Sequence, residues 1–374
     1  MHTENTITEF ETSRRHIAAI VWVLLGLGLV MTFSASCQKG TGFINLIRHM
    51  IWMLIGMLGF LLASRINHKV FKKLYIPILV AAFVLLALTL IPQIGKKVHG
   101  ARRWLRIGDW GFQPSEFAKF AFIIFFAAYF SQKKDVSKNF VKGFIVPLAI
   151  LGFGLGLIII EPDIGTSFLI ATVIFLIMLA AGTRILHIFI VTIVTAPLLL
   201  FTFWHKFPYF ARRLGQFFSG ELPYQQQQAL IAIGSGGLFG KGLGKGTAKL
   251  QFLPEAHTDF IYAIIGEELG FIGTIGVILL FIALIYQMMK IMQRSRDLYT
   301  SLVCVGIIMF IALQCLINLA VVTAVMPAKG IPLPFVSAGG SSLLFCMVSL
   351  GIFFNISRHV ERDVKMQLIE KEYE

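Results

Sequence analysis

The chain has 374 residues, of which 57% are hydrophobic and only 14% are charged, and its mean hydropathy is +0.80. Soluble domains contain roughly 25% charged residues, so this composition excludes a soluble globular enzyme. Glycine and proline contents are ordinary and there are only four cysteines, which excludes collagen-like, disordered and disulfide-framework proteins. The composition predicts a membrane protein. We therefore assign its net charge of +14 to loops beside anionic lipid and expect no nucleic-acid partner.

Windows of about 20 apolar residues, each long enough to cross roughly 30 Å of hydrocarbon, follow one another along the chain. Their approximate bounds are 16–36, 44–64, 74–95, 113–131, 143–160, 164–181, 186–205, 259–289, 301–326 and 341–357. We therefore predict an all-α polytopic membrane protein with about ten transmembrane helices. The first window is longer than the apolar region of a signal peptide, about 7 to 15 residues, and is predicted to be a retained helix.

An even number of spans places both termini on one side of the membrane, and the basic residues indicate which side. The loops on the side of the termini contain the larger share of the 33 Lys and Arg residues, so we expect both termini in the cytoplasm. The predicted organisation is a cytoplasmic tail over 1–15, a single membrane domain over 16–357 and a cytoplasmic tail over 358–374. One long extracytoplasmic loop, about 206–258, is expected between helices 7 and 8.

Most of the cations predicted to lie outside the cytoplasm fall in two segments, 96–106 and 206–249. They either face anionic lipid of the outer leaflet or form a site for an anionic ligand. The second segment is glycine-rich over 234–246, which excludes a regular helix and permits close approach of the backbone to a ligand. The neighbouring apolar stretch Ala229–Ile233 indicates that the loop is ordered.

Ionisable residues are costly inside a membrane and tend to be functional or paired. Those at or inside the predicted spans are Glu116, Lys119, Glu161, Asp163, Glu255, His257, Asp259, Glu267 and Glu268. All lie near the predicted outer face, and this shared depth indicates a single site. Glu267 and Glu268 point away from Asp259 on their helix, so we expect them to form structural pairs with Lys119 or with a polar loop.

Several of these features allow both a structural and a functional interpretation. Glu116 and Lys119 share a helix face and either neutralise each other or handle a phosphate and its leaving group. Asp259 stands at a helix start, where it either caps the helix or acts as a general base with a pKa raised from about 3.9 toward neutrality. The last predicted outer loop, Met326–Ser342, is either a re-entrant wall of the site or a plain turn. Trp104 is either an interface anchor or a platform for a sugar face.

Five motifs, taken together and in order, resemble the FtsW/RodA family, the SEDS group of shape, elongation, division and sporulation proteins. They are GARRWLRIG, QPSEFAK, EPDIGT, GSGGLFGKGLG with LPEAHTDFIYAIIGEELGFIG, and KGIPLPFVSAGGSSLL. Each motif is weak alone, but the set is specific, and the resemblance runs from about residue 16 to 357. One departure is Ala338, because family members usually have Tyr before the final Gly-Gly-Ser-Ser.

The resemblance implies a peptidoglycan glycosyltransferase that polymerises lipid II, with inversion, at the outer face of the bacterial cytoplasmic membrane. The essential acidic residue of the family corresponds to Asp259, which we interpret as the general base for the acceptor 4-hydroxyl. The residues expected to bind substrate are Arg103, Trp104, Glu116, Lys119, Glu255, His257, Lys329, Ser341 and Ser342. Arg103 and Lys119 are expected to hold the pyrophosphate together with a divalent ion, Mg²⁺ or Mn²⁺, for which the sequence itself shows no ligands.

Short sequence motifs indicate the branch of the family that the chain resembles. EAHTDF and the Lys329-Gly330 pair favour the division branch, whereas GKGLGKGT followed by LQFLPE is more typical of the elongation branch, and we favour division. The implied partner is a class B penicillin-binding protein, a transpeptidase, together with other membrane proteins of the divisome or elongasome.

Two other classes of protein remain open from the sequence. A transporter that flips lipid-linked precursors would also contain about ten helices, cations and buried carboxylates, although transporters usually place the site near the midplane. A non-catalytic scaffold that recruits a transpeptidase would explain the loops but not the intramembrane charges.

Overall fold

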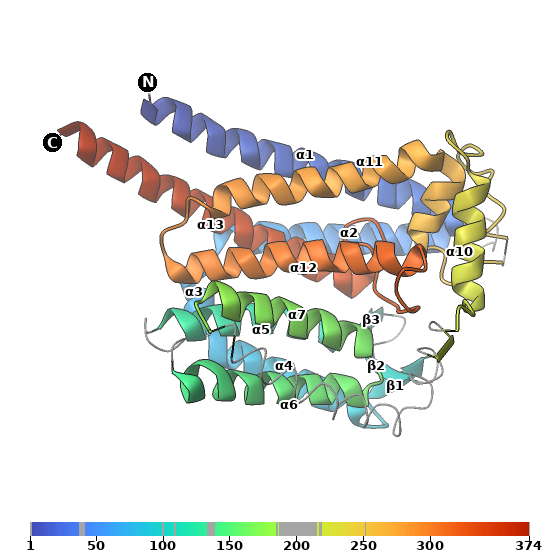
Figure 1. The fold of residues 1–374 in the computed structure, drawn as a ribbon, viewed down its shortest axis with the longest axis horizontal. Helices are drawn as coiled ribbons and strands as arrows, with labels where there is room; N and C mark the ends of the chain where they lie inside the picture. The colour runs from blue at the N-terminus through green and yellow to red at the C-terminus, as the bar shows by residue number, and fades with distance from the viewer. Residues whose placement is uncertain are drawn as a thin grey trace.

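The computed structural model describes residues 2–36, 42–98, 101–107, 110–132, 139–184, 186, 215–216, 219–250 and 252–373. The main helices are α1 (His2–Ser36), α2 (Gly42–Arg65), α3 (His68–Lys73), α4 (Tyr75–Leu90), α5 (Pro114–Ser131), α6 (Val146–Ile160) after a π-helical turn (Val141–Ile145), α7 (Ile164–Ala180), α10 (Tyr224–Ser235), α11 (Ile261–Met292), α12 (Leu298–Val322) and α13 (Gly340–Tyr373). The strands are β1 (Gly95–Val98), β2 (Ala101–Ile107) and β3 (Trp110–Phe112). The two termini lie at one end of the helical bundle, the terminal end, and α10 and the strands lie at the other, the loop end (Figure 1).

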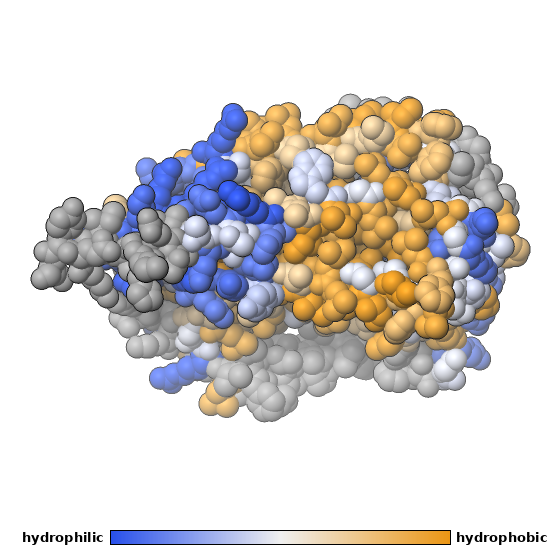
Figure 2. Space-filling model, turned by 90° about the horizontal axis from the view of Figure 1, so that it is seen from above, coloured by the Kyte–Doolittle hydropathy of each residue, from blue (hydrophilic) through white to orange (hydrophobic). Residues whose placement is uncertain are grey.

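The helices agree with the predicted spans. In the described residues, six helical segments are long and apolar enough to cross a membrane, including α1, α11 and α13, while α4 and α7 are shorter apolar helices. Each predicted span except the seventh coincides with a helix, and the seventh, 186–205, lies outside the described residues except for its first residue, as does the start of the loop predicted over 206–258. The face of the molecule above α1 and α11 is largely apolar between a hydrophilic terminal end and a smaller hydrophilic region at the loop end (Figure 2). The protein is a helical, multi-pass membrane protein.

The all-α prediction missed a small sheet between α4 and α5. Its strands are antiparallel in the order β1-β2-β3, with Gly95 opposite Leu105 and Leu105 opposite Phe112. β2 contains three arginines among apolar residues but lacks the strict alternation that marks a half-buried strand. The sheet was missed because hydropathy windows of about 20 residues do not resolve strands this short. It holds the described cations of the segment 96–106, which was predicted as a loop, in a fixed position at the loop end.

The long loop contains a further helix that positions its neighbours. α10 runs across the loop end, nearly perpendicular to α11 and α12 (Figure 1). The side-chain amide of Gln226 on α10 donates hydrogen bonds of 2.8 Å to the carbonyl oxygens of Val321 and Met326. Val321 lies at the end of α12, where its carbonyl oxygen also accepts from the backbone nitrogen of Ala324, and Met326 lies in the loop that follows. α10 therefore ties the end of α12 to the start of the last loop.

A break in α11 explains the glycine-rich sequence that precedes it. Gly270 has φ +68°, a conformation that favours glycine, and interrupts the helix. The carbonyl oxygens of Glu267 and Glu268 accept hydrogen bonds from the backbone nitrogens of Lys241 (2.9 Å) and Gly242 (3.1 Å). The glycine-rich loop therefore replaces the hydrogen bonds that the break removes from a membrane-spanning helix.

Replacing Gly270 by alanine is expected to lower the free energy of unfolding by about 1–3 kcal/mol or more, because of its positive φ. A Cβ there would also collide with the backbone nitrogen of Gly240. Gly276→Ala in the same helix is the control, since a Cβ there meets nothing within 4 Å. It is expected to leave the stability unchanged or raise it by up to about 1 kcal/mol. Thermal unfolding of the purified variants measures both effects, and equal stabilities would contradict a strained break.

Candidate functional site

Two loops meet at the loop end of the bundle, one leading into α11 and one joining α12 to α13. The side-chain amide of Asn318 on α12 donates hydrogen bonds of 2.8 Å to the carbonyl oxygens of Asp259 and Ile331, one in each loop. The hydroxyl of Ser337 donates to the carbonyl oxygen of Thr258 at 2.6 Å. The loop predicted over Met326–Ser342 therefore forms a wall against the segment that carries Asp259, as the re-entrant interpretation expects.

Asp259 lies at this junction and does not cap the following helix. The N-cap position of α11 is Phe260, and no side chain forms a capping hydrogen bond there. Asp259 is half-buried, and its Oδ2 would lie only 2.8 Å from a Cβ placed on Gly330, which is itself exposed. The glycine therefore leaves room for the carboxylate beside an open surface, and the structural interpretation of Asp259 as a cap is wrong.

The surroundings of Asp259 change its acid–base behaviour. Burial, followed by the negative charges of Glu255 and Asp163, raises the pKa of Asp259 to about 7 against the opposing positive charge of Arg103. A carboxyl group with a pKa near neutrality is suited to accept a proton from a substrate at physiological pH. The four side chains come from three separate parts of the chain.

Arg103 on β2 binds the turn between α6 and α7. Its Nε donates a 2.9 Å hydrogen bond to the carbonyl oxygen of Glu161, and its Nη2 donates to that of Pro162. Burial raises the pKa of Glu161 to about 7, although the hydroxyl of Thr89 donates a hydrogen bond to this carboxyl group and lowers the value. The sheet thus places the positive charge of Arg103 beside the turn that ends at Asp163.

Asp163 and Lys329 complete this group of charges. The Oδ1 of Asp163 caps α7 by accepting from the backbone nitrogen of Thr166 at 3.2 Å. The Nζ of Lys329 lies 5.2 Å from the centre of the Phe168 ring on the same helix. Burial lowers the pKa of Lys329, and the charge of Asp163 opposes this shift. Lys329 and Arg103 are therefore the predicted cations that the structure brings to the surroundings of Asp163.

The predicted pair Glu116 and Lys119 is buried beneath the last loop. Their charged groups are 2.7 Å apart, and the residues are only 2% and 4% exposed. The Nζ of Lys119 also donates to the Oε1 of Gln314 at 3.2 Å, and the amide nitrogen of Gln314 donates to the carbonyl oxygen of Pro332 (3.0 Å) and to the hydroxyl of Ser342 (3.1 Å). This geometry favours the ion-pair interpretation, in which the two charges support the loop from inside the bundle.

Trp104 packs within the sheet, and Ser341 joins the sheet to the helices. The Trp104 ring packs so closely on Gly111 that a Cβ there would lie 3.1 Å from the ring. The hydroxyl of Ser341 accepts a 3.1 Å hydrogen bond from the backbone nitrogen of Gln113 and donates a 3.4 Å bond to the carbonyl oxygen of Gly111. Ser341 therefore ties the start of α13 to the start of α5.

Glu255 and His257 lie in the loop that leads to Asp259. Glu255 has φ +54°, and its Oε2 accepts a 2.9 Å hydrogen bond from the hydroxyl of Thr258. The carbonyl oxygen of His257 accepts a 3.1 Å hydrogen bond from the backbone nitrogen of Ala338. The position where the family usually has Tyr therefore contacts this loop through its backbone.

The sequence reasoning missed the buried amides that hold the two loops. Gln314 and Asn318 lie one turn apart on α12 and are 0% and 1% exposed. Their spacing in an otherwise apolar helix was the available signal, because polar side chains in membrane helices face protein partners.

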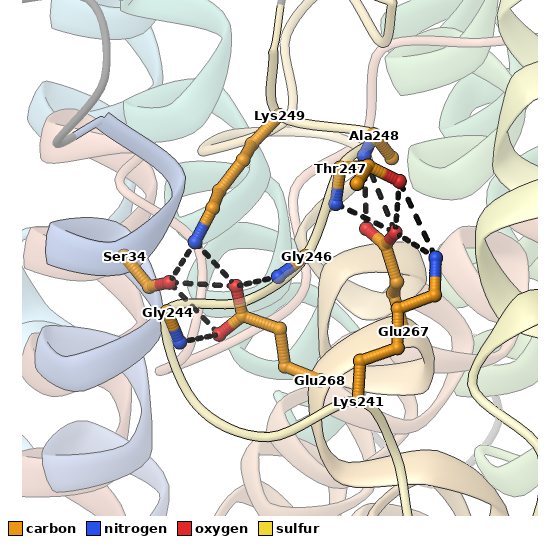
Figure 3. A network of polar contacts seen from close by, with 9 residues as sticks. All are labelled: Ser34, Lys241, Gly244, Gly246, Thr247, Ala248, Lys249, Glu267 and Glu268. Atoms are coloured by element: carbon orange, nitrogen blue, oxygen red, sulfur yellow. Dashed lines mark hydrogen bonds and ion pairs between the residues drawn. The ribbon is translucent and has the colours of Figure 1, made fainter.

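Glu267 and Glu268 anchor the glycine-rich loop (Figure 3). The Oε1 of Glu267 lies 2.8 Å from the Nζ of Lys241 and accepts a 2.7 Å hydrogen bond from the backbone nitrogen of Thr247. The Oε1 of Glu268 lies 2.6 Å from the Nζ of Lys249. Further donors to these carboxylates are Ser34, Gly244, Gly246 and Ala248. The predicted pairing with a polar loop is confirmed, and the alternative pairing with Lys119 is wrong.

Within the described residues, the protein by itself forms no metal site. No group of three or more His, Cys, Asp or Glu side chains that could hold an ion occurs in the part of the chain that the structure describes. Mg²⁺ is commonly bound by one or two carboxylates together with the phosphates of a substrate. The residues near Asp259 can offer only such a partial set of ligands.

The fold and site define a class of multi-pass membrane protein with a half-buried carboxyl group between two loops at one end of its helical bundle. A family model described as a cell cycle protein, and named for FtsW, RodA and SpoVE, matches residues 15–362. The chain therefore belongs to the FtsW/RodA/SpoVE family.

Individual relatives support this assignment. The chain is 39% identical over 348 residues to a probable peptidoglycan glycosyltransferase FtsW of Trichlorobacter lovleyi, covering 90% of this chain and 91% of the relative. Its fold is similar to that of the rod shape determining protein RodA of Thermus thermophilus, with a TM-score of 0.70, 25% identity, and coverage of 91% and 95% of the two chains. It is also similar to a chain in a structure described as structural coordination of polymerization and crosslinking by a peptidoglycan synthase complex, with a TM-score of 0.78, 24% identity, and coverage of 92% and 97%.

Proposed function

We propose that this protein is a peptidoglycan glycosyltransferase that polymerises lipid II at the extracytoplasmic face of the bacterial cytoplasmic membrane. Family membership and the name of the Trichlorobacter lovleyi relative support this activity. The observation that carries the proposal is the carboxyl group of Asp259, which is half-buried beside exposed Gly330 and has a pKa of about 7. A general base for a sugar hydroxyl requires both access to substrate and a pKa near the working pH.

In the proposed reaction, one proton is transferred, one bond forms and one bond to the leaving group breaks. Asp259 accepts the proton of the acceptor 4-hydroxyl, and the oxygen forms a bond to the anomeric carbon of the donor. The bond between that carbon and the pyrophosphate oxygen breaks with inversion, and its electron pair leaves with the lipid pyrophosphate. Arg103 and Lys329 stabilise the negative charge of this leaving group. Lys119, which was expected to share this task, is instead assigned with Glu116 to positioning the loop that carries Lys329, because both are buried.

A divalent ion, Mg²⁺ or Mn²⁺, is part of the proposal as a carrier of charge on the pyrophosphate. It would neutralise phosphate oxygens, with Asp163 as the carboxylate available near it, while Asp259 stays free to accept the proton. No step above depends on the ion.

The proposed topology has about ten membrane helices with both termini in the cytoplasm, which agrees with their position at one end of the bundle (Figure 1). We assign the chain to the division branch on the EAHTDF motif and on the name of its relative. The proposed partner is a class B penicillin-binding protein, because a chain of similar fold occurs in a peptidoglycan synthase complex.

The proposed function is tested by incubating purified protein with lipid II, with and without a class B penicillin-binding protein, and separating the glycan products by size. Glycan strands that appear only when the chain is present support the proposal. If no partner yields glycan while the chain moves lipid II between the leaflets of a vesicle, the protein is a transporter. If it does neither but still binds the transpeptidase, it is a scaffold.

The polymerisation rate is expected to rise with pH through about 7. Asp259 works as a base only after losing its proton, so the rate falls about tenfold for each pH unit below its pKa of about 7. Glu161 has a similar pKa, so Glu161→Gln is the matched control and is expected to keep the rising limb. The measurement is the initial rate between about pH 5 and 9. A wild-type rate that is flat over this range would refute the assignment of Asp259 as the base.

Gly330→Ala is expected to lower the polymerisation rate about 10- to 100-fold without unfolding the protein. The new Cβ would lie 2.8 Å from the Oδ2 of Asp259 and displace the carboxylate, and a displacement of about 1 Å can cost about 10²-fold in rate. Gly339→Ala in the same loop is the control, because its Cβ would meet its nearest atoms at an ordinary 3.4 Å. Similar rates for both variants would indicate that the space beside Asp259 is not needed.

A further inference from the structure

An apolar tip on the glycine-rich loop is left uncovered by the fold. Phe239 is 79% exposed, the highest value for a large apolar side chain among the described residues, and its neighbour Leu238 is 63% exposed. Adjacent exposed apolar side chains at a loop end are candidates for contact with a membrane or with another protein.

The tip is held in a defined position rather than on a loose segment. The backbone nitrogens of Phe271 and Ile272, just after the break in α11, donate hydrogen bonds to the carbonyl oxygens of Gly237 (2.9 Å) and Leu238 (3.2 Å). The same loop is tied down by the carboxylates of Glu267 and Glu268 (Figure 3). Leu238 and Phe239 are therefore fixed beside the start of the second part of α11.

That part of α11 carries an exposed apolar stripe. Its residues are Ile272, Ile275, Leu279, Ile282 and Tyr286, spaced three or four apart on one helix face and 36–59% exposed. The segment from Phe271 to Met292 is about 33 Å long at 1.5 Å per residue, which matches a hydrocarbon core of about 30 Å. It belongs to a helix long and apolar enough to span a membrane, so the stripe faces lipid and Ile272 lies near the boundary of the hydrocarbon. The face above α1 and α11 is correspondingly apolar (Figure 2).

We propose that Leu238 and Phe239 insert into the lipid leaflet at the loop end and anchor the glycine-rich loop to the membrane. The apolar stripe of α11 continues directly into this tip through the hydrogen bonds to Gly237 and Leu238. Lys245 follows the tip and is exposed, which places a cation where anionic lipid phosphates lie. The occupant of this surface is the bilayer, and the proposal does not depend on the activity of the protein.

The test measures the environment of the tip in a bilayer. The full-length protein with Phe239→Cys and Cys37→Ser is labelled with a nitroxide and placed, one chain per disc, in nanodiscs containing anionic phospholipid. Cys304, Cys315 and Cys346 are buried and do not compete for the label. Collision rates with oxygen, which concentrates in lipid, and with a water-soluble nickel chelate are compared by electron paramagnetic resonance. Ile282→Cys is the reference in lipid, and Glu221→Cys, at an exposed position before α10, is the reference in water.

The proposal expects the Phe239 label to have an oxygen-to-nickel ratio well above that of Glu221 and slightly below that of Ile282, as at the edge of the hydrocarbon. A ratio equal to that of Glu221 would place the tip in water and overturn the proposal. Low collision rates with both reagents would overturn it too, since they would mean that protein covers the tip. Unfolding temperatures close to that of the parent protein confirm that the labelled chains are folded.

Discussion

Replacing Asp259 by asparagine is expected to slow glycan polymerisation from lipid II about 10²- to 10⁴-fold, the contribution typical of a positioned general base. Asparagine has the same shape as aspartate but cannot accept the proton of the acceptor hydroxyl. The half-buried position beside Gly330 is retained, so substrate binding should change much less than the rate of the chemical step. The measurement is single-turnover polymerisation by purified protein with its transpeptidase partner.

The fold of this variant should be unaffected. The folded protein raises the pKa of Asp259 above the value in an unfolded chain, so this group lowers the stability as the pH rises through the two values. A neutral asparagine therefore removes an unfavourable charge at pH 8. Asp297→Asn is the matched control, because Asp297 caps α12 through the backbone nitrogen of Thr300 at 3.0 Å and asparagine caps equally well. Equal rates for the Asp259 and Asp297 variants would remove Asp259 from the mechanism.

Lys249→Met is expected to lower the free energy of unfolding by about 3–5 kcal/mol, because it leaves a buried carboxylate without its cation. Lys249 and Glu268 are 2.6 Å apart, and their side chains are 1% and 0% exposed. The hydroxyl of Ser34 lies 2.8 Å from Glu268 and 2.9 Å from the Nζ of Lys249, so the pair also ties the loop to α1. Loss of the pair should therefore release the glycine-rich loop from the bundle. Chemical denaturation in detergent measures the change.

Lys241→Met is the matched control for this prediction. The Lys241 side chain is 32% exposed, and its partner Glu267 keeps hydrogen bonds from the backbone nitrogens of Thr247 (2.7 Å) and Ala248 (3.0 Å). Partly exposed pairs contribute about 1 kcal/mol or less. Replacing both Lys249 and Glu268, by methionine and glutamine, should recover part of the lost stability, since no unpaired charge then remains. Equal losses for Lys249→Met and Lys241→Met would show that burial does not strengthen the first pair.

The membrane spans followed from the sequence because the length of an apolar run directly reflects the thickness of hydrocarbon that it must cross. The sheet did not, because its pairing joins Gly95 to Leu105 through a register that the local pattern does not specify. The same limit applied to α10, whose position across the bundle depends on the bonds of Gln226 to the end of α12, about a hundred residues away in the chain.

The candidate site, like the fold, could be predicted only in part from the sequence. The sequence pattern was sufficient to predict that charged groups gather at one end of a membrane protein and that Asp259 belongs to a specific motif. It could not decide between base and cap for Asp259, or between ligand and ion pair for Lys119. The three-dimensional structure excludes the cap, because no side chain caps α11, and it pairs Lys119 with Glu116 and Gln314 inside the bundle, while the role of Asp259 as the base stays a proposal. Burial and charge–charge interactions depend on distances in space, and these are set by contacts between segments far apart in the chain.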